Sequence, residues 1–308
     1  YVAFVYGLLP GMFLTLVAYY YFIKYTKEEH WYQLVISALS INLAILLIGN
    51  NLIHLLAIFA VAVIYFIRNK DWKIIAFILS CVFLMSAEKS VITNYYEVKS
   101  QKEIAEGVPK ITWIAMGMQE GEREAGWWNR FNYDIMPEEE YDEKRITEIS
   151  KTSMKQRLNV FRDNPKYAFD FYQRKYENQF IEPTFQSLLV TAPQRNFSNE
   201  TTLEKIRDFF IKQIYFNHTH TVLEFIMKVF QVFVYLFTFV FAVVMYKRKN
   251  EFFAIIPIAF IGGTLFNMIW EAKSRYIFPY FVFLIPLAAY GLVIVRNKIN
   301  EYKKLKEE

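Results

Sequence analysis

Three ionisable side chains, Glu271, Lys273 and Arg275, lie close together between two strongly apolar segments of this 308-residue chain. Charges at the end of a membrane helix are costly, so they usually belong to a polar site or a substrate path. Arginine presents a planar fork that suits phosphate oxygens, and lysine adds a point charge. We therefore expect Arg275 and Lys273 to hold an anionic lipid headgroup. A simple ion pair between Glu271 and Arg275, four residues apart, is the alternative.

A second group of side chains suited to ligand contact lies in the long polar part of the chain. Trp127, Trp128, Asn129 and Arg130 follow directly after Gly126. Aromatic rings stack on sugar faces, and amide and guanidinium groups bond hydroxyls or phosphates. We expect these four residues to contact a sugar or an acceptor. The alternative is that the tryptophan pair packs the domain onto the membrane surface.

Asn51 and His54 form a third candidate site, at the junction of two apolar segments. Both are expected at an outward-facing hairpin tip, where they could contact a substrate. A turn and a helix cap explain the pair Asn50-Asn51 without any ligand.

The composition points to a membrane protein rather than a soluble enzyme. Hydrophobic residues make up 55% of the chain, with 30 Phe and 22 Tyr, and the net charge of +5 is carried by short loops, so nucleic acid is not an expected partner. The single cysteine excludes an intrachain disulfide, and no Cys/His spacing suggests zinc. No metal site is predicted. The sequence identifies no cofactor, and a divalent cation stays open.

Seven apolar segments approach the length of about 20 residues that a helix needs to cross a bilayer. The expected fold is therefore an all-α polytopic membrane protein with about seven transmembrane helices and a mixed extracytoplasmic domain between the fourth and fifth. The predicted spans are residues 2–23, 31–48, 52–67, 72–92, 222–246, 252–270 and 276–295.

The basic loops give the expected orientation. Residues 68–73, 247–249 and 296–306 are rich in Lys and Arg and fall on one side when the spans alternate, so this side is predicted to be cytoplasmic. The predicted domains are transmembrane helices one to four in residues 1–94, an extracytoplasmic domain in 95–220, helices five to seven in 221–296, and a basic cytoplasmic tail in 297–308.

The extracytoplasmic domain has a mixed pattern. Residues 111–117 predict a short buried strand or an extended segment, whereas 138–161 and the stretch that opens at Asn164-Pro165 predict helices. An apolar stripe between charges, Leu203 to Ile214, is typical of an interfacial helix on the outer leaflet.

The run from Glu271 to Tyr276, followed by Pro279, resembles the last outer hairpin of bacterial relatives of the protein O-mannosyltransferases. These enzymes belong to the GT-C superfamily of polytopic glycosyltransferases. The resemblance implies sugar transfer from a polyprenyl-phosphate donor to a glycan or protein acceptor on the outer face of a plasma membrane, and the composition looks bacterial. It also implies that Arg275 contacts the donor phosphate, with Lys273 and Tyr276 beside it and Glu271 in support.

The family's catalytic base is usually an Asp or Glu in the first outer loop, and no loop of this chain matches it. We therefore expect the chain to be the C-terminal part of a larger enzyme whose base lies upstream. Two other classes of protein stay open. One is a transporter or flippase of a lipid-linked or anionic substrate, which would favour charges at mid-bilayer and inverted repeats. The other is a non-catalytic accessory membrane subunit.

Overall fold

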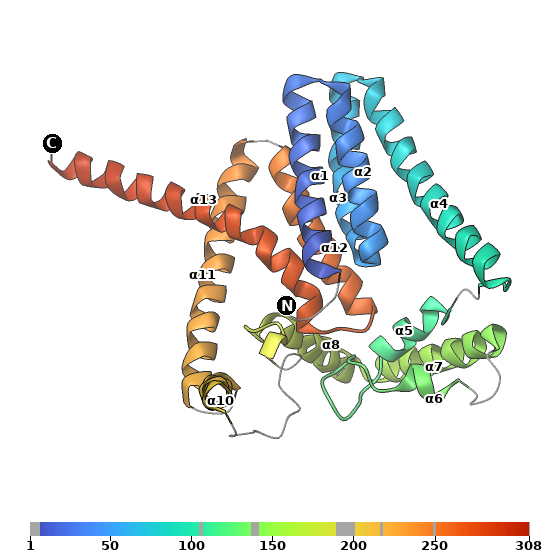
Figure 1. Ribbon diagram of the computed structural model, residues 1–308. Coiled ribbons are helices and arrows are strands. Elements are labelled where there is room, and N and C mark those ends of the chain that lie inside the picture. Colours follow the sequence, from blue (N-terminus) through green and yellow to red (C-terminus); the bar gives the residue numbers. More distant parts are fainter. Residues whose placement is uncertain are drawn as a thin grey trace. The chain divides into compact units, whose positions relative to one another are not determined.

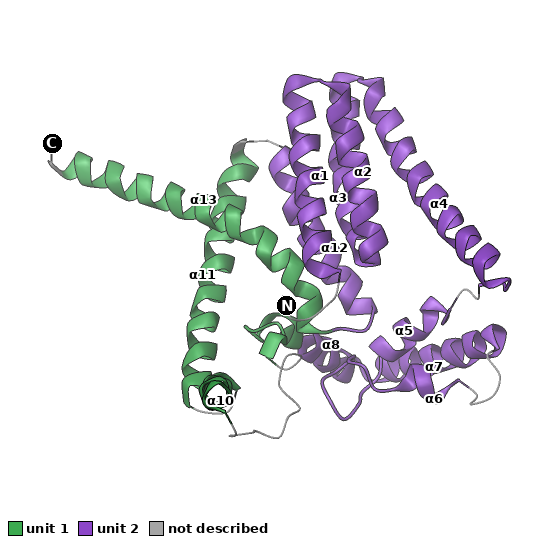
Figure 2. Ribbon diagram, viewed as in Figure 1, with its two compact units in different colours: residues 1–5, 176–249, 273–308 green, residues 6–175, 250–272 purple. Residues whose placement is uncertain are grey.

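The computed structural model describes residues 7–104, 107–136, 142–188, 201–215, 218–248 and 251–307. Within these ranges the regular structure is entirely helical, which confirms the all-α membrane fold (Figure 1). Parts of two predicted helices, residues 2–6 and 138–141, lie outside the described ranges. The chain forms two compact units (Figure 2). Among the described residues, unit 1 holds residues 176–188, 201–215, 218–248 and 273–307, and unit 2 holds the others.

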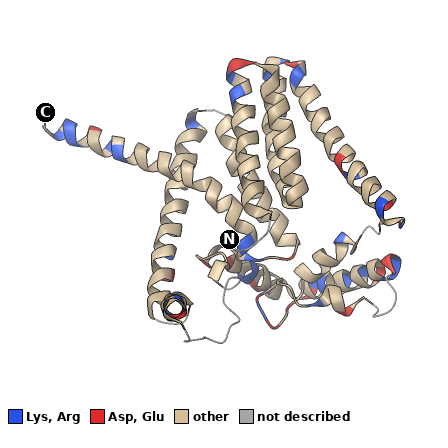
Figure 3. Ribbon diagram, in the orientation of Figure 1, with Lys and Arg blue, Asp and Glu red and all other residues tan. Residues whose placement is uncertain are grey.

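Unit 2 contains a bundle of five apolar helices. They are α1 (Leu8–Glu28), α2 (Trp31–Leu47), α3 (Leu52–Asn69), α4 (Trp72–Ser100) and α12 (Ile255–Ile269), with short 3-10 turns at Gly49–Asn51 and Glu251–Ala254. The helix α1 packs along α2, and α3 packs against both α4 and α12. Charged residues gather at the end of the α1–α4 bundle that holds the loops after α1 and α3 (Figure 3).

Each of the seven predicted spans is largely helical over its described residues. Among the described residues, five helices are long and apolar enough to cross a membrane: those at 49–69, 72–100, 218–247, 252–269 and 274–306. The helix α2 is apolar but shorter, at 17 residues. The helix α1 carries the consecutive tyrosines 19–21, which dilute its apolar character.

Four further helices of unit 2 follow the α1–α4 bundle: α5 (Lys110–Gly117), α6 (Phe131–Asp134), α7 (Glu143–Asp163) and the first part of α8 (Pro165–Phe180). The two predicted helices correspond to α7 and α8. The predicted strand at 111–117 is wrong, because this segment is the helix α5. Its buried residues Thr112, Ala115 and Met116 follow helical spacing, and the Thr112 hydroxyl bonds Ser150 of α7 at 3.1 Å. A short apolar run does not by itself separate the two structures.

Unit 1 is built on two long helices, α11 (His218–Arg248) and α13 (Ser274–Glu307), with α10 (Thr202–Tyr215) before them. The two long helices run in the same general direction and cross each other (Figure 1), since Phe230 contacts Phe281 and Phe241 contacts Tyr290. Their backbones come close at Gly291, where an added Cβ would lie 2.0 Å from the carbonyl oxygen of Phe237. Small residues permit this backbone contact in membrane helix pairs. The predicted alternation of spans requires that α11 and α13 run in the same direction.

Candidate functional site

Two regions of the molecule carry features of a site, one in each unit, and each is described by itself. The boundary between the units falls between Ala272 and Lys273. Glu271 is therefore described with unit 2, whereas Lys273, Arg275 and Tyr276 are described with unit 1.

In unit 2, two stretches that the sequence analysis singled out separately lie against each other. The amide of Ala272 donates to the carbonyl of Gly126 at 3.0 Å. An added Cβ on Gly117 would lie 2.5 Å from the carbonyl carbon and oxygen of Trp270. Gly126 has φ +70°, and an added Cβ at this residue would lie 2.6 Å from the carbonyl oxygen of Gly117. Two glycines therefore allow the loop after α5 to contact the backbone at the end of α12.

Lys175 of α8 closes this contact. Its side chain is fully buried, and Nζ donates to the carbonyls of Gly117 at 2.5 Å and Trp270 at 2.7 Å. Burial lowers the pKa of Lys175 to about 7, and the nearby Glu271 carboxylate opposes that shift. Glu271 itself is buried, with 3% of its surface exposed. This lysine binds main-chain oxygens of its own protein, so it acts as a structural clamp.

Lys175 is a residue that the sequence reasoning missed. The available signal was its position in α8, because Ala168, Phe171 and Lys175 follow the three- and four-residue spacing of one helix face. Phe171 is fully buried on that face. A lysine that continues a buried stripe needs an internal partner.

Around the same loop, a second polar network was also missed. The Glu120 carboxylate accepts from the Tyr167 hydroxyl at 2.8 Å and from Arg174 at 2.6 Å. Arg157 bonds the Tyr167 hydroxyl at 2.9 Å and the carbonyl of Met118 at 2.8 Å. Partial burial raises the pKa of Glu120, but the bonds from Arg174 and Tyr167 outweigh it and lower the pKa overall. These bonds fix the loop on α7 and α8.

The predicted sugar contacts lie on this loop, where the polar atoms of Trp128 and Asn129 bond within the loop and the buried Trp127 indole nitrogen has no hydrogen-bond partner among the described residues. The Asn129 amide donates to Gln119 at 2.8 Å, and the Trp128 indole donates to Asn132 at 3.1 Å. Trp127 is half-buried beneath the Arg123 guanidinium, 5.5 Å from its ring centre. Arg130 is exposed.

Arg130 is also the N-cap residue directly before α6, in a left-handed conformation with φ +72°.

The third predicted pair, Asn51 and His54, is buried inside the helical bundle. The Asn51 amide donates to the carbonyl of Ala44 at 2.7 Å, and His54 Nδ1 bonds the Tyr19 hydroxyl at 2.7 Å. These bonds account for both residues without a ligand.

In unit 1, the predicted phosphate-binding residues lie at the beginning of α13. The carbonyl of Lys273 accepts from the amide of Tyr276 at 3.0 Å, which starts the helix. Arg275 is half-buried, and its guanidinium lies 5.3 Å from the centre of the Tyr276 ring. The Lys273 ammonium lies 6.0 Å from the same ring. Pro279 has no amide hydrogen, so the helical bond to the carbonyl of Arg275 is not made.

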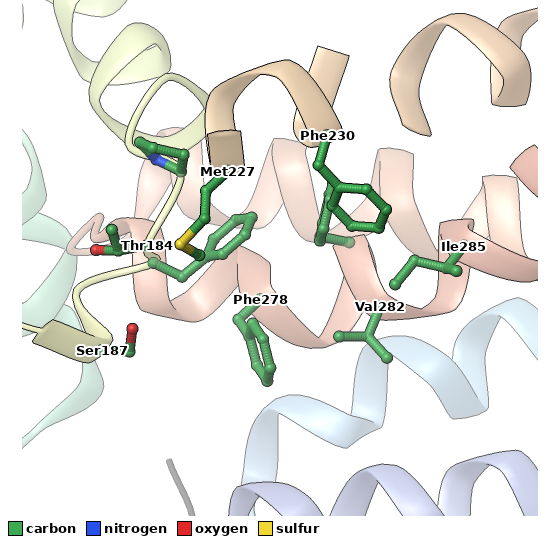
Figure 4. A pocket seen from close by; sticks show the side chains of 10 residues that line it. Thr184, Ser187, Met227, Phe230, Phe278, Val282 and Ile285 are labelled. Atoms are coloured by element: carbon green, nitrogen blue, oxygen red, sulfur yellow. The ribbon is translucent and has the colours of Figure 1, made fainter. Parts of the chain in front are cut away.

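A cavity of about 330 Å³ opens beside the same helix (Figure 4). Three segments line it: the turn after α8, the first half of α11, and α13. Its lining is Pro183, Thr184, Phe185, Ser187, Met227, Phe230, Phe278, Phe281, Val282 and Ile285. Except for two hydroxyl groups at one end, the side chains are apolar, and four of them are aromatic.

Glu182 fixes the turn that forms one wall of this cavity. Its carboxylate accepts from the amide of Thr184 at 2.8 Å and from the Ser274 hydroxyl at 2.9 Å. The next residues, Phe185 and Gln186, adopt left-handed backbone with φ +49° and +59°. The Phe185 ring then lies 4.9 Å from that of Phe281. No sequence pattern predicts this wall, because it depends on backbone conformation rather than on spacing.

Among the described residues, no group of three or more His, Cys, Asp or Glu side chains could hold a metal ion.

A family model described as "conserved hypothetical integral membrane protein" matches residues 5–293. No curated protein and no solved structure matches the chain significantly.

Proposed function

Since the chain belongs to this family of conserved integral membrane proteins, we propose that it is part of a membrane glycosyltransferase that uses a polyprenyl-phosphate sugar donor. Unit 1 is the proposed donor site. The observation that carries the proposal is the order of features along α13, where a cationic turn is followed directly by the wall of an apolar cavity. A lipid phosphate has the same order, with an anionic head and then a hydrocarbon chain.

One helical stripe links the two parts of this site. Arg275, Phe278, Val282 and Ile285 recur at three- and four-residue intervals, so they share a face of α13. Three of them line the cavity, and Arg275 begins the stripe. This arrangement supports a ligand that lies along α13 with its phosphate at Arg275.

The cavity supports the same ligand class by its size and chemistry. A volume of about 330 Å³ is at the lower end of the range for small-molecule sites. It suits the first part of an isoprenoid chain, while the rest of the chain stays in the bilayer. Phe185, Phe230, Phe278 and Phe281 offer ring surfaces to unsaturated hydrocarbon.

In the proposed reaction, an acceptor hydroxyl attacks the anomeric carbon as the bond from that carbon to the phosphate oxygen breaks. Negative charge grows on the departing lipid phosphate, where Arg275 and Lys273 stabilise it. The acceptor proton passes to a base, and we assign that role to none of the residues described above. Trp127, Trp128, Asn129 and Arg130 remain the proposed contacts for a glycan or protein acceptor.

The proposed location is a bacterial plasma membrane with the site on the outer side. In unit 2, basic residues lie in or near the loops after α1 and α3 at one end of the bundle: Lys24, Arg68, Lys70 and Lys73. The positive-inside rule favours a cytoplasmic position for that end. In unit 1, the basic ends of α11 and α13 are opposite to the beginning of α13, in agreement with the same orientation.

Lipid binding tests the proposal directly. Farnesyl phosphate, a short isoprenoid phosphate, is titrated against the full chain in nanodiscs, with farnesol as the uncharged comparison. Loss of a charge-assisted contact of about 1.5–3 kcal/mol should weaken phosphate binding about 10- to 150-fold in Arg275→Ala. Arg275→Lys should also bind more weakly, because it loses the planar fork. Farnesol binding should not change.

Arg296→Ala is the matched control, since it removes the same residue type from the exposed distal part of the same helix. It should leave both affinities unchanged. Equal affinity of wild type and Arg275→Ala for farnesyl phosphate, in folded protein, would refute the donor site.

A further inference from the structure

The helix α10 exposes an apolar stripe that the other described residues of unit 1 do not cover. Leu203, Ile206, Phe210 and Ile214 follow helical spacing, and Leu203 and Phe210 are 80% and 58% exposed. Phe209 flanks the stripe and is also exposed. A stripe of this size on a short helix needs an apolar surrounding.

Local bonds define where this helix begins. The Thr201 hydroxyl accepts from the amide of Glu204 at 3.2 Å, and the Glu204 carboxylate accepts from the amide of Thr201 at 3.0 Å. This reciprocal pair is a capping box, which satisfies two backbone donors at a helix start. The helix is therefore specified by its own sequence, although Asp208 is the only residue of it described as buried.

The corner between α10 and α11 is also fixed. The Thr219 hydroxyl donates to Gln213 at 3.0 Å, and His220 Nδ1 bonds the carbonyl of Ile214 at 2.8 Å. In Figure 1, α10 is seen along its axis, whereas α11 runs across the picture, so the two axes cross steeply. Because α11 is long and apolar enough to span a membrane, a helix that crosses it steeply lies near the membrane plane.

The two lysines of α10 fit the same pattern, while Arg207, which lies one turn after Leu203, pairs with Asp208 at 2.9 Å. Lys205 and Lys212 are seven residues apart, on the helix face opposite to Leu203 and Phe210, and both are exposed. Lysine at this position reaches lipid phosphates while the apolar side enters the acyl boundary. The exposed Phe225 of α11 continues the apolar surface into the span.

We infer that α10 lies in the membrane–water interface, with its apolar stripe inserted among lipids and Lys205 and Lys212 at the headgroups. This inference does not depend on the proposed sugar transfer. It places the cavity at a defined depth, because Met227 and Phe230 lie about 14 and 18 Å along α11 from its beginning. The cavity residues then lie within the hydrocarbon layer, at a level where a lipid chain enters from the side.

Spin labels on the full chain in nanodiscs of phosphatidylethanolamine and phosphatidylglycerol test this inference. Cys81, the only cysteine, is replaced by alanine, and single cysteines are placed at Leu203, Phe210, Lys205 and Lys212. The measurement is the accessibility of each label to oxygen, which concentrates in lipid, relative to a water-soluble nickel chelate. Reference labels at Phe225 and at the exposed Lys151 of α7 mark the lipid and water limits.

We expect labels at Leu203 and Phe210 to match Phe225, and labels at Lys205 and Lys212 to lie close to Lys151. Four water-like labels would overturn the inference. Shielding of the stripe labels from both reagents would also overturn it, because a protein partner or a second copy would then cover the stripe. If either stripe variant fails to fold, Ile206 or Ile214 provides the replacement position.

Discussion

The contact around Lys175 in unit 2 and the cavity beside α13 in unit 1 both join segments that are far apart in the chain, but in opposite ways. In unit 2, two glycines bring backbones into contact, and a buried lysine fills the remaining space and bonds two carbonyls. In unit 1, aromatic side chains surround a space that protein atoms leave open. The Lys175 ammonium in unit 2 bonds two main-chain carbonyls. The turn of unit 1 that carries Lys273 and Arg275 precedes the wall of an open cavity that a ligand can fill.

This difference separates two explanations for charged residues in a membrane protein. Lys175 is buried because the fold uses its hydrogen bonds, and Arg174, its neighbour in sequence, is about half-exposed and pairs with Glu120. A buried charge therefore does not by itself identify a ligand site. Three substitutions would break or sharpen the comparison, from the largest expected effect to the smallest.

Gly117→Ala should break the closed contact of unit 2. An alanine Cβ would lie 2.5 Å from the Trp270 carbonyl group and 2.8 Å from the amide of Glu271, so backbone has to move. We expect a loss of about 3 kcal/mol or more in the free energy of unfolding, measured by denaturant titration in mixed micelles. Hydrogen exchange should also speed up for the amides of residues 117–130.

Gly49→Ala is the matched control, because nothing lies within 4 Å of its added Cβ. Its stability should change by no more than about 0.5 kcal/mol. Similar stability of the Gly117→Ala variant and wild type would mean that the contact is not tight in the membrane.

The free energies of unfolding of wild type and Lys175→Met, compared over a series of pH values, should show how much stability is lost by burying the lysine ammonium. The pKa of Lys175 is about 7 in the folded protein and 10.5 in the reference state. Between these values the unfolded chain holds more protons, so the stability of the wild type rises with pH. Methionine does not titrate. The stability of wild type relative to Lys175→Met should therefore increase by about 2–3 kcal/mol from pH 7 to pH 9.

The hydrogen bonds survive this titration, because a neutral amine retains two N–H groups for the two carbonyls. A difference that does not vary with pH would contradict the prediction. It would mean that the carboxylate of Glu271 keeps the lysine protonated throughout.

Phe230→Ala should affect the open cavity without much effect on the fold. Phe230 lines the cavity and is 51% exposed, so its removal should change unfolding by less than about 1–2 kcal/mol. Binding of farnesyl phosphate should weaken about 5- to 30-fold, since a ring surface for the chain is lost. Phe233→Ala is the control, because Phe233 is 52% exposed on the same helix but does not line the cavity. Equal losses of binding in both variants would argue against the cavity as the chain site.

Much of the fold was predictable from apolar periodicity. The seven predicted spans are largely helical over their described residues, because long apolar runs in a bilayer have few other conformations. The helix at 110–117 was not predictable, since an apolar run of that length fits a strand equally well, and its packing on α7 decides the outcome. The turn after α8 was not predictable for a different reason. It needs left-handed backbone at Phe185, which is unusual for a bulky residue.

For the candidate sites, the sequence indicated individual residues but not which of them lie together in the folded protein. It singled out Glu271 and Arg275 by charge, and Gly126 and Trp127 by composition. It did not indicate that the stretches around Gly126 and Glu271 pack together, because that contact depends on Lys175. Asn51 looked accessible in sequence, but tertiary packing buries it and gives it a backbone partner.

The way unit 1 is composed has a consequence for biosynthesis. The cavity needs side chains from both α11 and α13, while α12, which lies between them in the chain, belongs to unit 2. During translation, α11 therefore enters the membrane before its partner helix exists, and Met227 and Phe230 face lipid in that interval. When α13 arrives and packs along α11, the cavity closes around a surface already covered by acyl chains rather than by water.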